Sequence, residues 1–96
     1  MKVIHNRIDL ALVSTKPEEV VDIGEMGFDR ADLCVELVGG GSVTIEGSEK
    51  EDGTFDDYSL TVTVPEGGFY RGRIPMDMPK YIRLAADNGA KLSVRA

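Results

Sequence analysis

Apolar and polar residues alternate with a period of two along most of this chain, and this pattern restricts the fold more than any other feature. Clear examples are LCVEL at 33–37 and YSLTVTV at 58–64. Successive side chains of a β-strand point to opposite faces, so each run predicts a strand with one buried and one solvated face. Similar runs predict further strands at 8–13, 20–23, 43–46, 69–74, 81–84 and 92–95. About eight short strands in 96 residues predict an all-β protein, either a sandwich or a barrel.

Turn-forming residues separate these runs. Three consecutive glycines, Gly39 to Gly41, follow Val38, and Asn88-Gly89 lies between the last two expected strands. Asn-Gly is a strong hairpin signal, so we expect a hairpin there. The best helical candidate is Lys16–Val21, which follows the capping residue Thr15 and would form one turn at most.

Nothing in the sequence divides the chain into parts. It contains no internal repeat, low-complexity tract or linker, and 96 residues suffice for one domain at most. We therefore expect a single β-sandwich domain over 1–96. Residues 1–7 precede the first clear alternation and form either an N-terminal arm or a first strand.

The single cysteine indicates where such a chain is made. Cys34 excludes an internal disulfide and lies among apolar residues, which favours a buried structural role and a reducing compartment. Residues 1–15 lack the pattern of a signal peptide, and no apolar run approaches the ~20 residues of a membrane helix. We therefore expect no membrane partner.

Charge is unevenly distributed along the sequence. Residues 1–69 carry 15 acids and 5 bases, whereas 70–96 carry 2 acids and 6 bases, and the whole chain has a net charge of −6. This balance argues against nucleic acid as the main partner. Two interpretations remain open: the two regions pair with copies of the chain or with a charged protein surface, or they provide solubilising charge at strand edges and loops.

No motif predicts catalysis, a cofactor or a metal ion. His5 is the only histidine and has no ligand or triad partner near it in sequence. The acidic stretch 46–57 is the nearest candidate for a cation site, but it lacks the ligand spacing of a calcium loop and is better explained as a solvated hairpin tip. We expect a protein that is not an enzyme and needs no cofactor.

The strongest candidate for a functional surface is FYRGRIPMDMPKYIRLA, residues 69–85. Arg, Tyr, Phe and Met are enriched where proteins contact proteins, and Gly72 allows a bend or a close approach. The predicted interface with another subunit or with a partner protein comprises Phe69, Tyr70, Arg71, Arg73, Met76, Met78, Lys80 and Tyr81. The structural alternative places Ile74, Met76 and Ile82 in the core and the two arginines on the wet side of a strand.

The order of segments from about Val20 to Val94 resembles a known family. VVDIG, DLCVELVG, SVTIEGSE, a long acidic hairpin and SLTVTV are followed by YRGRIPM and PKYIRL. This series is similar to the small capsid cement, or decoration, proteins of tailed bacteriophages, of the Bordetella-phage type. The resemblance implies a jelly-roll-like antiparallel β-sandwich that forms a homotrimer. It also implies a virion protein, made in the bacterial host cytoplasm, that binds the major capsid protein on the outside of the expanded capsid and stabilises it.

A second functional hypothesis belongs to another class. The same sandwich could be a glycan-binding or receptor-binding module of a phage tail or fibre. Sugar-binding platforms favour exposed aromatic faces, and the chain has no Trp and three Tyr. Glycan binding by a monomer would favour this second hypothesis.

Overall fold

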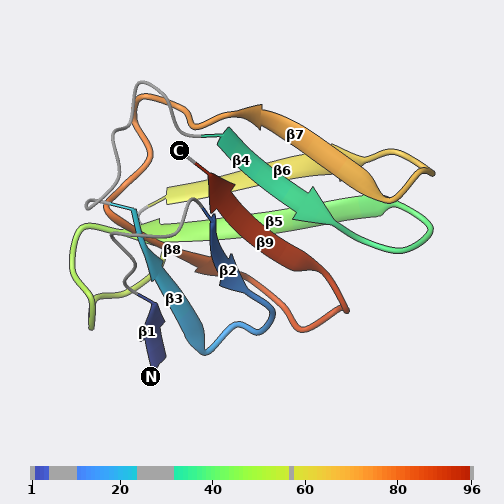
Figure 1. Cartoon of the computed structure of the whole chain (residues 1–96). Helices are drawn as coiled ribbons and strands as arrows, with labels where there is room; N and C mark the ends of the chain where they lie inside the picture. The colour runs from blue at the N-terminus through green and yellow to red at the C-terminus, as the bar shows by residue number, and fades with distance from the viewer. Residues whose placement is uncertain (1, 5–10, 24–31, 57, 96) are drawn as a thin grey trace.

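The described residues form nine β-strands in two sheets (Figure 1). The computed structural model describes residues 2–4, 11–23, 32–56 and 58–95. The strands are β1 (Lys2–Ile4), β2 (Ala11–Ser14), β3 (Glu19–Asp22), β4 (Asp32–Glu36), β5 (Gly41–Ser48), β6 (Tyr58–Val64), β7 (Phe69–Arg73), β8 (Tyr81–Leu84) and β9 (Lys91–Arg95). The prediction of an all-β sandwich is confirmed, and the barrel alternative is excluded.

The strand order is that of a jelly roll with one added strand. One sheet has the order β1-β3-β8-β5-β6 and the other β2-β9-β4-β7. The antiparallel pairs β2·β9, β3·β8, β4·β7 and β5·β6 are nested, as in one long hairpin wound into two sheets. Its tip is the acidic segment between β5 and β6. The parallel pair of β1 with β3 adds the fifth strand to the first sheet, so residues 2–4 form a first strand.

Two local predictions were wrong. The segment expected to form a helical turn is a tight turn followed by β3, in which the Glu19 N–H donates to the Lys16 carbonyl (3.0 Å). The Thr15 N–H and hydroxyl both donate to the Glu19 carboxylate (2.9 Å each), which closes this turn. Asn88-Gly89 does not form a hairpin, because β8 and β9 lie in different sheets and the chain crosses between them.

The core lies between the sheets and contains the inward residues of the alternating runs. Val43 and Ile45 of β5 and Val62 and Val64 of β6 are buried, and their neighbours in sequence face outward or are half-buried. None of the described buried side-chain nitrogen or oxygen atoms lacks a hydrogen-bond partner. Cys34 is fully buried, as predicted. The described segments include no helix long and apolar enough to cross a membrane.

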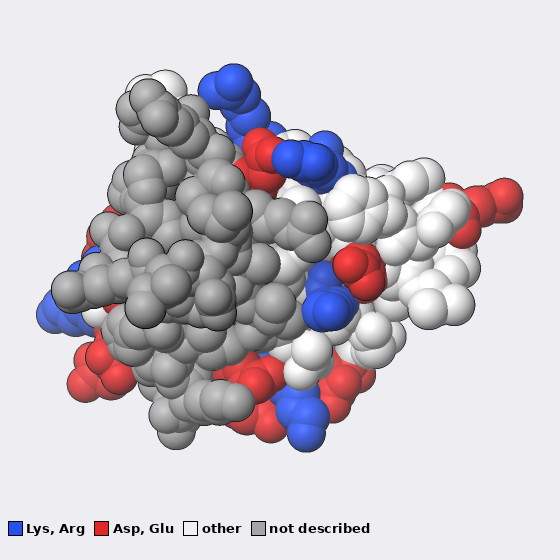
Figure 2. All heavy atoms as spheres, viewed as in Figure 1, with Lys and Arg blue, Asp and Glu red and all other residues white. Residues whose placement is uncertain are grey.

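Nested pairing brings the acidic and basic halves of the sequence together. Arg71 of β7 forms an ion pair with Asp32 of β4 (2.6 Å), and Arg83 of β8 forms one with Glu46 of β5 (3.2 Å). On the face shown in Figure 2, basic and acidic atoms lie side by side where the residues are described. The charge asymmetry along the sequence therefore does not produce one basic and one acidic end, and the solubilising interpretation fits these residues better than head-to-tail attraction.

Candidate functional site

Four loops meet at one end of the sandwich and form a groove of about 730 Å³. They connect β2 to β3, β4 to β5, β6 to β7 and β8 to β9, and the last three lie at the right of Figure 1. We call this site the loop-end groove; its lining residues are Thr15, Lys16, Glu36, Val38, Gly39, Glu66, Gly67, Gly68, Phe69, Gly89, Ala90 and Lys91. The strand order places these loops together, because the chain returns to the same end of the sandwich after every second strand.

Two large apolar side chains on this groove face solvent. Val38 is fully exposed and Phe69 is 43% exposed, whereas most apolar residues of the described strands are buried. Backbone bonds hold both loops in place: the Leu37 N–H donates to the Gly68 carbonyl (2.9 Å) and the Gly40 N–H to the Leu37 carbonyl (2.9 Å). Exposed apolar groups on a concave surface that backbone hydrogen bonds keep in place, with Lys and Glu at its rim, are typical of a binding site for another molecule.

The predicted interface begins in β7, where it divides between two faces. Phe69, Arg71 and Arg73 point outward and are exposed, while Tyr70 is half-buried and packs against the core. A Cβ on Gly72 would lie 2.6 Å from the Tyr70 hydroxyl, so the glycine leaves room for this ring. The expected close approach at Gly72 is therefore present, and it serves the fold.

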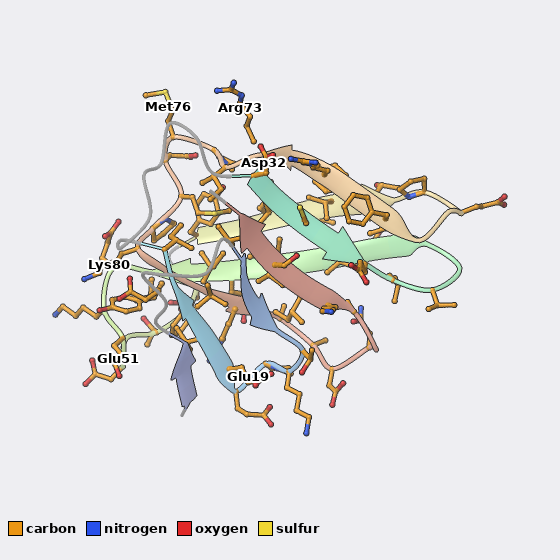
Figure 3. All side chains as sticks on the ribbon, viewed as in Figure 1. Glu19, Asp32, Glu51, Arg73, Met76 and Lys80 are labelled. Carbon is orange, nitrogen blue, oxygen red and sulfur yellow. The ribbon has the colours of Figure 1, made fainter. Side chains whose placement is uncertain are left out.

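The rest of the predicted interface lies at the opposite end from the groove. Met76 is fully exposed, and Figure 3 shows it near Arg73, on the same side of the molecule as Lys80. Met78 is 4% exposed and belongs to the core, so it offers no contact surface in this conformation. Tyr81 is half-buried, with the Lys80 ammonium 5.2 Å from its ring centroid.

The outcome for the structural alternative is mixed. Ile74 and Ile82 are buried, as that alternative expected, and the two arginines are on the solvated side of β7. Met76 differs, because it projects into solvent from the turn between Pro75 and Met78. The eight predicted residues thus form no single patch, and Phe69 is separated from Met76 by the length of β7.

Local electrostatics are dominated by ion pairs. The Arg71 Nε and a terminal nitrogen both donate to one carboxylate oxygen of Asp32 (2.9 and 2.6 Å), and these bonds raise the pKa of Arg71. Burial raises the pKa of Tyr58 at the start of β6, and the nearby Asp77 carboxylate raises it further. Both shifts move a pKa further from neutral pH, so Arg71 stays positively charged and Tyr58 stays neutral there.

The two sequence candidates for metal chemistry have different outcomes. His5 lies outside the described residues. The tip between β5 and β6 is described except for residue 57, and its Phe55 is buried beneath Arg83, whose guanidinium carbon lies 4.3 Å from the ring centroid. Within the described ranges, no three Asp, Glu, His or Cys side chains come together where they could hold a metal ion.

Sequence reasoning missed the loop-end groove. Its residues come from four separate parts of the chain and meet through long-range pairing. One signal was present: Val38 directly precedes three glycines and lies beyond the alternation of β4, so it has no inward position to occupy.

Comparisons with protein-family models, with curated proteins and with solved structures find no match for this chain.

Proposed function

We propose that this protein is a virion structural protein, a capsid cement or decoration protein of a tailed bacteriophage. It binds as a homotrimer to the major capsid protein on the outer surface of the expanded capsid and stabilises the shell. The observation that carries the proposal is the loop-end groove with its exposed Val38 and Phe69. The jelly-roll strand order and the resemblance of residues 20–94 to this family support it.

Multivalency makes the proposed role physically reasonable for so small a protein. A single contact with a 96-residue domain would be weak, because association costs several kcal/mol before any gain. A trimer engages the shell through three copies, and the second and third contacts are effectively intramolecular. Avidity then exceeds the affinity of one site by about 10²–10⁴.

The exposed members of the predicted interface serve this role in the proposal. Phe69 contributes at the groove, Arg71 and Arg73 along β7, and Met76 and Lys80 at the opposite end. With contacts available at both ends, one end can meet the shell and the other a neighbouring copy. Tyr70 and Met78 support the surface from the core side.

The test combines native mass measurement with co-sedimentation on purified phage shells. We expect a mass three times the 10.4 kDa of one chain, and co-sedimentation with expanded shells in preference to unexpanded ones. Replacing Val38 or Phe69 with Asp should abolish co-sedimentation, while the same change at Thr54, an exposed residue of the β5–β6 tip, should not.

The result that would overturn the proposal is equally specific. A monomeric mass together with no binding to either kind of shell removes it. Phe69 is an aromatic residue on a groove, so a monomer that binds sugars on a glycan array, and loses this binding on Phe69→Ala, would establish the glycan-binding module instead.

A further inference from the structure

Strand β6 lies at the edge of the five-stranded sheet. It pairs with β5 over seven consecutive residues, from Tyr58 to Val64, with no bulge. In the part of the chain that the structure describes, no strand pairs with its other side. One row of backbone groups along β6 therefore faces outward from the sheet.

The register identifies which residues provide these groups. The Ala85 N–H donates to the Thr44 carbonyl (2.9 Å), so the backbone groups of Thr44 point toward β8. Along a strand, the backbone N–H and C=O groups of successive residues point to opposite sides. Those of Thr44 point away from β6, so Thr44 forms no backbone hydrogen bond with Thr61, the residue opposite it. Their hydroxyls are 2.9 Å apart, which fits the closer spacing of such pairs. The outward N–H and C=O groups of β6 therefore belong to Ser59, Thr61 and Thr63.

The β6 edge carries none of the features that usually prevent pairing with another chain. Natural edge strands are short, charged, bulged or interrupted by proline. The sequence of β6, YSLTVTV, has no charge, no Pro and no Gly. By contrast, Arg71 and Arg73 face outward from β7, the edge of the other sheet. The sandwich is thus protected at one of these edges and open at the other.

We propose that β6 pairs antiparallel with β6 of a second copy of this chain, around a two-fold axis at Thr61. Only Ser59, Thr61 and Thr63 have free backbone groups, so the pairing must join members of this set. The register that uses all of them places Thr61 opposite Thr61 and Ser59 opposite Thr63. The two five-stranded sheets then become one continuous sheet.

The chemistry of the strand favours a second copy as the occupant. In this register Tyr58 lies opposite Val64 and Leu60 opposite Val62, all on the core-facing side of β6. Aromatic and β-branched residues are favourable cross-strand partners, and Tyr58 and Leu60 are each still partly exposed in one copy. The same two-fold arrangement at β7 would place Arg71 against Arg71, which like-charge repulsion disfavours. A two-fold pair cannot itself form the proposed trimer, so the pairing uses a surface other than the trimer contact and joins trimers at the protein concentrations where it forms. It does not depend on the proposed function.

A pair of cysteine variants tests the register. In Thr61→Cys the two Cα atoms would lie about 5.5 Å apart across the axis, within the range of a disulfide. In Thr63→Cys they would lie about 14 Å apart, which is too far. Under mild oxidation we expect a covalent dimer from T61C and little or none from T63C; native Cys34 is buried and serves as the background. Equal yields from both variants, or no dimer from folded T61C, would overturn the proposal.

A second pair of variants tests the backbone bonds. Thr63→Pro removes an outward N–H and leaves the bonds to β5 intact, so the fold is retained, while Thr63→Val keeps both the N–H and the branched shape. In the T61C background, T63P should abolish the disulfide and T63V should preserve it. Hydrogen exchange of the Ser59, Thr61 and Thr63 amides in the native protein should slow as protein concentration rises. Exchange that is independent of concentration, or dimers that persist in T63P, would contradict the pairing.

These results separate the pairing from the function proposed above. Shell binding by a variant that cannot pair through β6 would leave the cement role intact, because the trimer contact lies on another surface in either case. Disulfide dimers of T61C in a protein that binds no shell would support the β6 pairing and contradict the proposed cement role.

Discussion

Replacing Gly47 with Ala should destabilise the protein at one defined contact. Gly47 is buried in β5, and its missing side chain leaves space for the ring of Pro79. A Cβ there would lie 2.9 Å from two Pro79 ring carbons and 3.3 Å from the Tyr58 ring. The first distance is too short for real atoms, so either the proline or β5 must move.

The size of the effect follows from the stiffness of the neighbour. A proline ring cannot turn aside as a long side chain would, and overpacking a well-packed core costs about 1–3 kcal/mol. For a chain of 96 residues, that lowers the melting temperature by about 4–24 °C. Pro79 belongs to the segment that carries Met76, so the strain should also disturb this exposed residue.

Thermal and urea denaturation of the variant measure this cost. Gly67→Ala is the matched control, because a Cβ at Gly67 meets nothing within 4 Å and the backbone there is not left-handed. We expect this control to be stabilised by about 0.4–1 kcal/mol. A Gly47→Ala variant within about 0.5 kcal/mol of the natural chain would show that the Pro79 contact does not restrict β5.

Three further predictions concern charge, pH and the thiol. Reversing both Arg71 and Arg73 to Glu should abolish co-sedimentation with expanded shells, and it should also lower the melting temperature, because it replaces the Arg71–Asp32 ion pair with two neighbouring carboxylates; unchanged binding would make both residues structural only. The raised pKa of Tyr58 means that the folded state keeps a proton that the unfolded chain loses, so stability should fall as pH rises above 10.0, and Tyr58→Phe should flatten this fall. An equal fall in the variant would assign it to other groups. Cys34 should react with a thiol reagent at the rate of unfolding; fast labelling of the native protein would mean that β4 opens locally.

The exposed residues of the candidate surfaces were only partly predictable from sequence. The composition of 69–85 drew attention to Phe69 and Met76, and the structure shows that both are exposed apolar residues. It could not separate them from Tyr70 and Met78, which have similar side chains but face the core. Residue type indicates what a side chain can contact, whereas its direction depends on the strand register and on the turn that holds it.

The sequence by itself determined the strands of this protein. Alternation with a period of two is a local property, since it records which side chains lie on the same face of an extended chain. The runs at 33–37 and 58–64 therefore predicted β4 and β6 with their buried faces. Cys34 was assigned to the interior for another local reason, because its neighbours in sequence are apolar.

Only the tertiary structure decided which strands are neighbours. Ala11 pairs with Arg95 and Asp32 with Arg73, and such choices depend on closing long loops and on filling one common core. This pairing combined the acidic and basic halves of the chain, built a groove from four loops and left β6 at an edge. These features depend on contacts between distant residues, which no local pattern of side chains can specify.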